Sequence, residues 1–167
     1  MTYSVRIAVP EDVPAVTALF EATYPPLFAA GYGPEVLAAA LPRMTKANPR
    51  LLASGNFFVA ARQGGEIIGC GGWSKERPGT SEIHVGAGHI RHFATHPDWL
   101  RHGIGRANID RCSEQARAAD IAQFECYSSL VAVGFYRAIG FSVEREMTLD
   151  LGDGVSIKGM LMRREIG

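Results

Sequence analysis

The sequence predicts a mixed α/β domain in which helices flank one central sheet. Runs that alternate between apolar and polar residues recur between segments with helical apolar spacing, in the order β-α-α-β-β-β-α-β-α-β-β. Short glycine turns at 63–66 and 152–154 each separate two strand-like runs, which indicates hairpins. A Gly-x-Gly loop at 103–105 joins a further strand-like run to a helical one.

Length and composition favour one folded domain spanning 1–167. The chain has 167 residues, of which 47% are apolar and 20% charged, and this is ordinary for a globular domain with a substantial core. It contains no repeat, linker or low-complexity segment. Lys plus Arg and Asp plus Glu are equal at 17 each. Because non-specific nucleic-acid binding depends on excess positive charge, no nucleic-acid partner is expected.

The sequence also predicts a cytoplasmic protein without a membrane partner. No apolar run approaches the roughly 20 residues that a bilayer span requires, and the first residues lack a charged and then apolar leader. The cysteines, Cys70, Cys112 and Cys126, are odd in number and far apart. We therefore expect reduced, buried thiols, and neither a disulfide framework nor a zinc site.

The N-terminal half is predicted from its apolar spacing and its prolines. A strand at 4–9 is followed by a helix that Pro10 opens and Pro25-Pro26 ends. After a loop at 27–32, a second helix is expected to start at Pro34, to break near Pro42 and to finish by Pro49. Strands at 56–62 and 67–74 then form a hairpin. The inner stripe of the first helix comprises Val13, Val16, Leu19, Phe20 and Thr23.

The C-terminal half begins with a loop at 75–88, rich in glycine, proline and serine, which we expect to be mobile. A central strand from Ile90 stops before Pro97, which has no N–H to donate. The helix that follows the glycine loop turns Ile109, Cys112, Ala116 and Ala119 inward. A strand at 122–127, a short helix at 130–139 and a hairpin of 141–151 with 155–164 complete the chain.

The 103–105 loop has the features of an anion site. Glycines allow backbone N–H groups to turn toward a ligand, and a helix N-terminus favours negative charge. The loop is not a Walker A loop, because no Gly-Lys-Ser/Thr follows, and it is not a dinucleotide fingerprint, because the third glycine is replaced by Asn108. A tight turn without a ligand is the alternative. Positive side chains surround the loop at Arg101, His102 and Arg106.

A second stretch, Leu130 to Phe141, contains Phe-Tyr-x-x-x-Gly-Phe at 135–141. Together with the run His96-Pro97-Asp98-Trp99 and its Gly-x-Gly loop, it resembles the GNAT superfamily of acyl-CoA-dependent N-acyltransferases. The resemblance covers nearly the whole chain in order and spacing. It implies a GNAT-like fold, with a mixed, mostly antiparallel central sheet flanked by helices.

The resemblance also implies a site for acetyl-CoA, used as a cosubstrate. Its diphosphate would bind the backbone N–H groups of Arg101, His102, Gly103, Ile104, Gly105 and Arg106. Its pantetheine arm would lie in a splay between the fourth and fifth strands, against Phe93, Ala94, Thr95, Ser129 and Ala132. Leu100 stands where the family has Arg or Gln, and Ser129 where it has Asn. In the family, the residue at the position of Leu100 acts mainly through its backbone N–H, so diphosphate binding should survive this change. Ser129 weakens one side-chain contact to the pantetheine arm but keeps a hydroxyl.

For catalysis, the resemblance assigns the general acid to Tyr136. A phenol with a pKa near 10 stays protonated at neutral pH and matches a thiolate leaving group; a core tyrosine packed beside Phe135 is the alternative. The general base falls first on His89, with His92 and Glu125 as second choices, and a surface or loop histidine is the alternative for His89. No metal is expected, because the spacing of the histidines at 84, 89, 92 and 96 fits no standard site.

The predicted function is therefore transfer of an acetyl group from acetyl-CoA to a primary amine of a small molecule or peptide. A catalytically silent CoA-binding sensor or regulatory module is the alternative, and a plain structural domain is a third reading. The expected acceptor pocket is aromatic, which favours a small amine with an apolar body or a peptide N-terminus. Exposed strand edges predict a homodimer. The expected pocket residues are Tyr24, Phe28, Tyr32 and Trp73, of which Trp73 is better explained as core.

Overall fold

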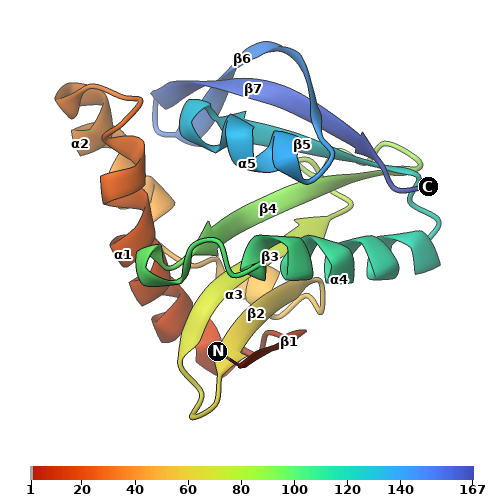
Figure 1. The fold of residues 1–167 in the computed structure, drawn as a ribbon. Coiled ribbons are helices and arrows are strands. Elements are labelled where there is room, and N and C mark those ends of the chain that lie inside the picture. The colour runs from red at the N-terminus through yellow and green to blue at the C-terminus, as the bar shows by residue number, and fades with distance from the viewer. Residues whose placement is uncertain (1) are drawn as a thin grey trace.

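In the computed structural model, which describes residues 2–167, the strands form one seven-stranded sheet in the order β1-β2-β3-β4-β5-β7-β6 (Figure 1). Only β4 and β5 run parallel, and every other neighbouring pair is antiparallel. The mixed, mostly antiparallel sheet predicted from the sequence is therefore confirmed. The strands are β1 Tyr3–Ile7, β2 Phe57–Arg62, β3 Ile67–Ser74, β4 Ala87–Thr95, β5 Gln123–Ser129, β6 Ser142–Gly152 and β7 Val155–Glu165.

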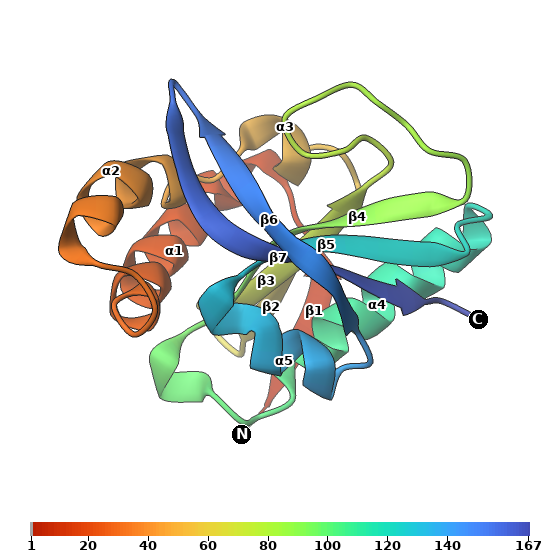
Figure 2. The same ribbon diagram turned by 90° about the horizontal axis from the view of Figure 1, so that it is seen from above.

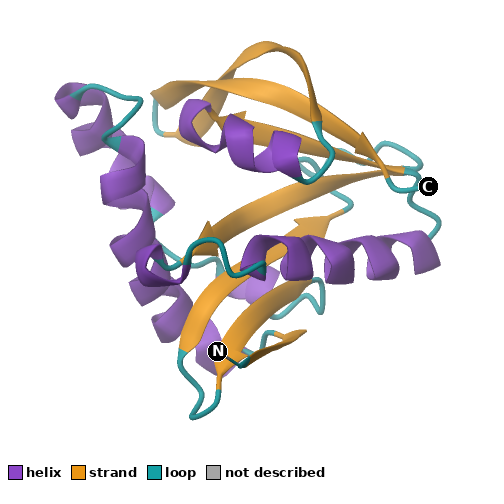
Figure 3. Ribbon diagram, in the orientation of Figure 1, coloured by secondary structure: helices purple, strands orange, loops and turns teal. Residues whose placement is uncertain are grey.

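The helices cover both faces of the sheet. Seen from above, α1, α2 and α3 lie on one side of the strands, and α4 and α5 lie on the other (Figure 2). Figure 3 shows the same arrangement with all helices in purple. The helix bounds are α1 Val13–Phe28, α2 Pro34–Met44, α3 Pro49–Leu52, α4 Ile104–Ala118 and α5 Val133–Ala138.

The sheet separates two main apolar cores, because successive side chains on a strand point to opposite faces. On β2, Phe57 and Val59 pack into the core under α1 to α3, whereas Phe58 packs into the core under α4 and α5. Trp73 is 1% exposed and belongs to the second core, where its indole Nε1 donates to Gln115 Oε1 at 2.7 Å. The preference for Trp73 as a core residue, not a pocket wall, is confirmed.

The predicted end of the first helix at Pro25-Pro26 is wrong, because α1 continues to Phe28. Two prolines in the last turn remove N–H donors, but they leave the preceding turns intact. Aromatic packing holds the segment in the helix: the ring centroids of Phe20 and Tyr24 are 5.1 Å apart, and those of Tyr24 and Phe28 are 5.4 Å apart. Tertiary packing therefore outweighs the local signal.

Pro49 begins a further helix, α3, which the sequence did not predict. In α3 Pro49 takes the first helical position, where its missing N–H costs nothing. The side-chain oxygen of Asn48 accepts from the N–H groups of Arg50 and Leu51 at 3.0 and 3.3 Å, which is a helix N-cap. Helix α2 ends earlier than expected, and it runs through Pro42 without a break.

Candidate active site

The central feature of the site is a gap between β4 and β5. The two strands pair only at Ala87↔Gln123, Gly88↔Phe124 and His89↔Glu125, and the rest of each strand has no partner on the other. The strands diverge beyond His89, as Figure 1 shows, and the splay expected from the sequence is present. An unpaired strand edge can pair with the amides of an extended ligand.

A cavity of about 390 Å³ opens on one side of this gap. Its walls come from the end of α1, the second half of β4, the turn after β4, and α5, and they are mostly apolar. These features fit a flexible, partly apolar arm that runs beside a strand edge. The lining residues are Thr23, Tyr24, Pro26, Leu27, Phe93, Ala94, Thr95, Pro97, Leu100, Val131, Ala132, Phe135 and Tyr136.

The glycine loop adjoins this cavity through Leu100. Arg101 and Gly103 both have positive φ, at 64° and 74°, which turns the backbone sharply before α4 begins at Ile104. Within residues 2–167, none of the N–H groups from Arg101 to Arg106 donates to a protein acceptor. Free donors at a helix N-terminus form an anion-binding surface.

Gly105 is needed for close packing beside this loop. A Cβ built on Gly105 would lie 2.4 Å from Cε1 of Phe135, so any side chain there would displace the ring. Arg106 on α4 links the same two segments, since its Nη2 donates to the carbonyl of Ala138 on α5 at 2.9 Å. The N-terminus of α4 and helix α5 are thereby held together.

Tyr136 lies on α5 where the walls of two cavities meet. Its ring packs edge-to-face on Phe135 and Phe141, with centroid distances of 5.0 and 5.4 Å, and on Phe93 at 6.2 Å. Burial raises the pKa of the phenol well above its ordinary value, and nearby Cys126 adds to this effect. Tyr136 therefore stays protonated across the physiological range and keeps a proton to donate.

The second cavity, of about 430 Å³, shares Tyr136 with the first. It is lined by α1, α2, the loop after β3, β4, β5 and the β6–β7 hairpin. Of the aromatic residues expected to form the acceptor pocket, Tyr24 and Phe28 line it. Tyr32 does not: its hydroxyl donates to the carbonyl of Lys158 at 2.6 Å and accepts from Leu130 N–H at 2.9 Å. Tyr32 thus ties three segments of the chain together.

His92 reaches the second cavity through a β-bulge. The register of β3 with β4 shifts between Cys70 and Gly72, and His92 opposite this shift has a φ of 51°. The side chain is exposed and lines the cavity together with Tyr136. Desolvation, the larger cause, and the charge of Arg91, the smaller one, lower the pKa of His92 below its ordinary value. At neutral pH the imidazole is uncharged and able to accept a proton.

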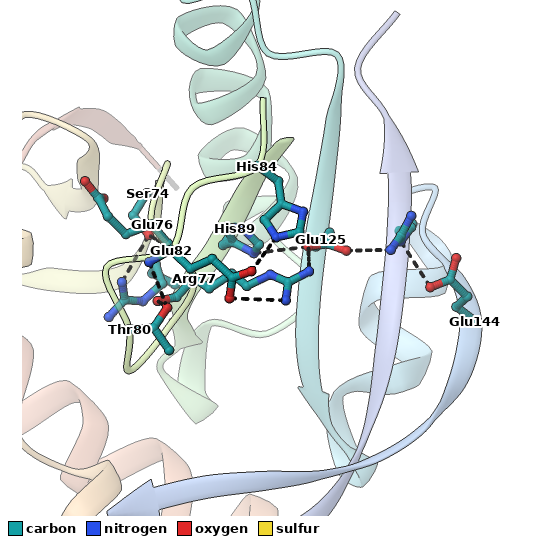
Figure 4. Close-up of polar contacts among 11 residues, drawn as sticks. Ser74, Glu76, Arg77, Thr80, Glu82, His84, His89, Glu125 and Glu144 are labelled. Carbon is teal, nitrogen blue, oxygen red and sulfur yellow. Dashed lines mark hydrogen bonds and ion pairs between the residues drawn. The ribbon is translucent and has the colours of Figure 1, made fainter. Parts of the chain in front are cut away.

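His89, the first choice for the base, lies elsewhere. It is 1% exposed and lines neither cavity. Its Nδ1 is 3.5 Å from Oε1 of the buried Glu125 (Figure 4). The other carboxylate oxygen, Oε2, lies 2.7 Å from Nη2 of Arg163. Burial lowers the pKa of His89, while Glu125 acts in the opposite direction. This pair connects β4 to β5 at the point where the strands separate.

The remaining predicted site residues divide between the two cavities. Ala94 and Thr95 line the first cavity, Ser129 lines the second, and Phe93 and Ala132 line both. All three cysteines are buried and free. Burial raises the pKa of Cys126, which lies in the wall of the second cavity, to about 12. Its thiol is therefore protonated and a poor nucleophile at neutral pH.

Solved structures resemble this fold over its whole length. The PaiA N-acetyltransferase from Thermoplasma acidophilum in complex with coenzyme A superimposes with a TM-score of 0.73 at 16% identity, covering 99% of each chain. A GCN5-related N-acetyltransferase from Rhodopseudomonas palustris gives 0.76 at 22% identity, covering 99% of this chain and 96% of that one. The ribosomal-protein-S18-alanine N-acetyltransferase from Escherichia coli gives 0.64 at 15% identity, covering 99% and 95%.

A splayed α/β sheet with free N–H groups beside the splay is the arrangement expected of an acyl-CoA-dependent transferase. The family model described as acetyltransferase (GNAT) domain matches residues 29–163, which is most of the chain. The chain therefore belongs to the GNAT family of acetyltransferases, whose members use acetyl-CoA. No functionally curated protein matches the sequence. No helix within residues 2–167 is long and apolar enough to span a membrane.

Proposed function

We propose that this enzyme transfers an acetyl group from acetyl-CoA to a primary amine of a small molecule or peptide, by direct attack of the amine on the thioester. The observation that carries the proposal is the junction of the two cavities, which would let two substrates meet from opposite sides. Tyr136 stands at this junction. The residues that line both cavities are Tyr24, Leu27, Phe93, Ala132 and Tyr136.

Acetyl-CoA fits the first cavity and the loop beside it. The N–H groups from Arg101 to Arg106 would bind the diphosphate, and the unpaired edge of β4 at Phe93, Ala94 and Thr95 would face the pantetheine arm. Tyr24 orders this edge, because its hydroxyl donates to the carbonyl of Phe93 at 3.0 Å. Ser129 and Ala132 would complete the site from β5 and the segment before α5.

In the proposed reaction, the neutral amine attacks the thioester carbonyl carbon from the second cavity. As the C–N bond forms, the nitrogen becomes acidic enough for the uncharged imidazole of His92 to accept its proton, directly or through a water. As the C–S bond breaks, Tyr136 donates its phenolic proton to the thiolate. The products are an amide and a free thiol. His92 then releases its extra proton to solvent and Tyr136 takes one up, so both side chains return to their starting states.

Release of the thiol from acetyl-CoA tests this function. Wild-type protein should release thiol only when an amine is present, across a panel of amines, amino acids, polyamines and aminoglycosides, and mass spectrometry should find the acetylated amine. A catalytically silent sensor binds coenzyme A but releases no thiol with any amine. A plain structural domain binds no coenzyme A, so calorimetry separates that case.

His92→Ala should lower kcat/KM at neutral pH by about 10²-fold, near the lower end of general base catalysis. Because the pKa of His92 is lowered from its ordinary value, the wild-type base is uncharged at neutral pH and above. The loss should shrink at high pH, where hydroxide can accept the proton, and added imidazole should restore part of the rate. His89→Gln is the comparison. Imidazole rescue of His89→Gln, with His92→Ala fully active, would assign the base to His89.

The proposal also includes the domain extent, the cellular location and the assembly of the chain. Residues 1–167 are taken as a single GNAT-like domain, and the buried free thiols favour a reducing compartment such as the cytoplasm. Strand β6 is one of the two outer strands of the sheet and offers an unpaired edge, which supports a homodimer. Light scattering at about 50 µM, a concentration at which weak pairing becomes detectable, should give twice the chain mass. A monomeric mass would refute the dimer.

A further inference from the structure

The second cavity has a mixed apolar and cationic wall. Three arginines line it, Arg43 from α2, Arg77 from the loop after β3, and Arg91 from β4. Two carboxylates, Glu82 and Asp150, also line it. The sequence did not predict that these three arginines meet at one cavity, because they come from segments far apart in the chain. Which of these charges is available to a ligand depends on the partners that each already has.

Two of the arginines are already balanced by carboxylates. Arg43 Nη1 lies 2.8 Å from Oδ2 of Asp153. Arg77 lies between two carboxylates, with Nη1 3.7 Å from Glu82 Oε2 and Nη2 3.8 Å from Glu125 Oε1, as Figure 4 shows. These arginines hold the loop after β3 and the β6–β7 turn in place. The positive charges of Arg43 and Arg77 are therefore already neutralised by carboxylates of the protein.

Arg91 differs because its partner is neutral. Its Nη1 donates to the hydroxyl of Ser74 at 3.0 Å, and no carboxylate of residues 2–167 lies within 4.0 Å of its guanidinium. The side chain is half-buried, and burial lowers its pKa, against the weaker pull of Glu76. A partly buried charge without an anion is costly, so an anionic ligand here would be bound favourably.

The position of Arg91 relates the charge to the chemistry. It directly precedes His92, and the bulge of β4 brings both side chains to the same cavity. Apolar residues from α1 and β6 form much of the rest of the wall, including Phe28, Met147 and Leu149. The cavity thus offers a proton acceptor, one unbalanced guanidinium and an apolar surface.

We propose that the acceptor is an α-amino acid with an apolar or aromatic side chain, and that Arg91 binds its carboxylate. This inference rests on the proposed acetyl transfer and narrows its acceptor. A guanidinium can hold a carboxylate through two parallel hydrogen bonds, which would fix the amine beside it. Polyamines and aminoglycosides are disfavoured, because their positive charges would approach Arg91, whose charge no carboxylate balances.

The test compares L-phenylalanine with L-phenylalaninamide, which share an amine and a side chain and differ in the carboxylate. Thiol release is followed at a pH where both amines are neutral, in wild type and in Arg91→Gln. Wild type should prefer the amino acid by roughly 30-fold or more in kcat/KM, as expected for a charge pair held by hydrogen bonds. Arg91→Gln should remove that preference, mainly through KM, while turnover of the amide stays within about threefold.

Arg50→Gln is the matched control, since Arg50 is exposed, lines neither cavity and forms no ion pair within the described residues. It should keep the wild-type preference. Arg91→Lys keeps the charge but not the two parallel hydrogen bonds, so it should retain only part of the preference. Its activity with the amide shows that the fold tolerates change at this position. Equal use of both acceptors by wild type, or an unchanged preference in Arg91→Gln, overturns the inference and leaves acetyl transfer intact. Absence of thiol release with every amine instead overturns the proposed function and this inference with it.

Discussion

Gly105→Asp is expected to abolish coenzyme A binding. The new Cβ would lie 2.4 Å from the ring of Phe135, so the loop and α5 must separate. The new carboxylate would then stand beside the N–H groups proposed to hold the diphosphate. Two like charges about 4 Å apart near a protein surface cost on the order of 4 kcal/mol, or roughly 10³-fold in affinity. Titration calorimetry with coenzyme A measures the loss directly.

Gly33→Asp is the matched control for this variant. It introduces the same charge at a glycine with open space around its Cβ and with ordinary backbone angles before α2. Aspartate is also a favourable residue at a helix N-cap. Gly33→Asp should bind coenzyme A as wild type does. Both variants should show a thermal unfolding transition, which establishes that each of them is folded. Retained affinity in Gly105→Asp would show that the diphosphate lies elsewhere.

Tyr136→Phe is expected to reduce turnover by roughly 10²- to 10⁴-fold, the usual contribution of general acid catalysis. The substitution removes only the phenolic hydroxyl and keeps the ring packing against Phe93, Phe135 and Phe141. Coenzyme A affinity should hold, because the loop is untouched. The loss should therefore appear in kcat, with the dissociation constant for coenzyme A unchanged.

Cys126→Ala separates this mechanism from a covalent one. Cys126 lies beside Tyr136 in the cavity wall, but with a pKa of about 12 its thiolate fraction at pH 7 is on the order of 10⁻⁵. Most of the activity should survive its removal. A fully active Tyr136→Phe together with an inactive Cys126→Ala would reverse the assignment and require an acyl-enzyme.

The sequence predicted the fold where local chemistry dominates. Strand β3 begins and ends at the predicted residues, because a glycine turn precedes it and its apolar run is continuous. Prolines misled the prediction at the end of α1 and at Pro49. At α1 the stacked rings of Phe20, Tyr24 and Phe28 hold the last turn, and such contacts cannot be seen in a local pattern.

The sequence located the glycine loop and, in the second cavity, the pocket residues Tyr24 and Phe28, but it did not predict most of the rest of that cavity. The glycine loop is a contiguous segment, and its backbone geometry follows from its own residues. The second cavity joins α2, the loop after β3, β4, β5 and the last hairpin, so its composition depends on tertiary contacts. His89 was preferred over His92 because of its place in the resemblance to the family, and the bulge at His92 cannot be seen in the sequence. Arg91 was missed because the cavity that it lines is assembled from distant segments.

Acceptor dependence of the first turnover tests direct acetyl transfer most closely. Enzyme in slight excess is mixed rapidly with acetyl-CoA, with and without an amine that the panel has identified, and free thiol and intact protein mass are recorded together. With the amine, thiol and acetylated amine should appear at the same rate in equal amounts. Without it, no thiol should be released and the protein mass should stay unchanged. A burst of thiol without amine, matched by an acetyl group on the protein, would contradict direct attack.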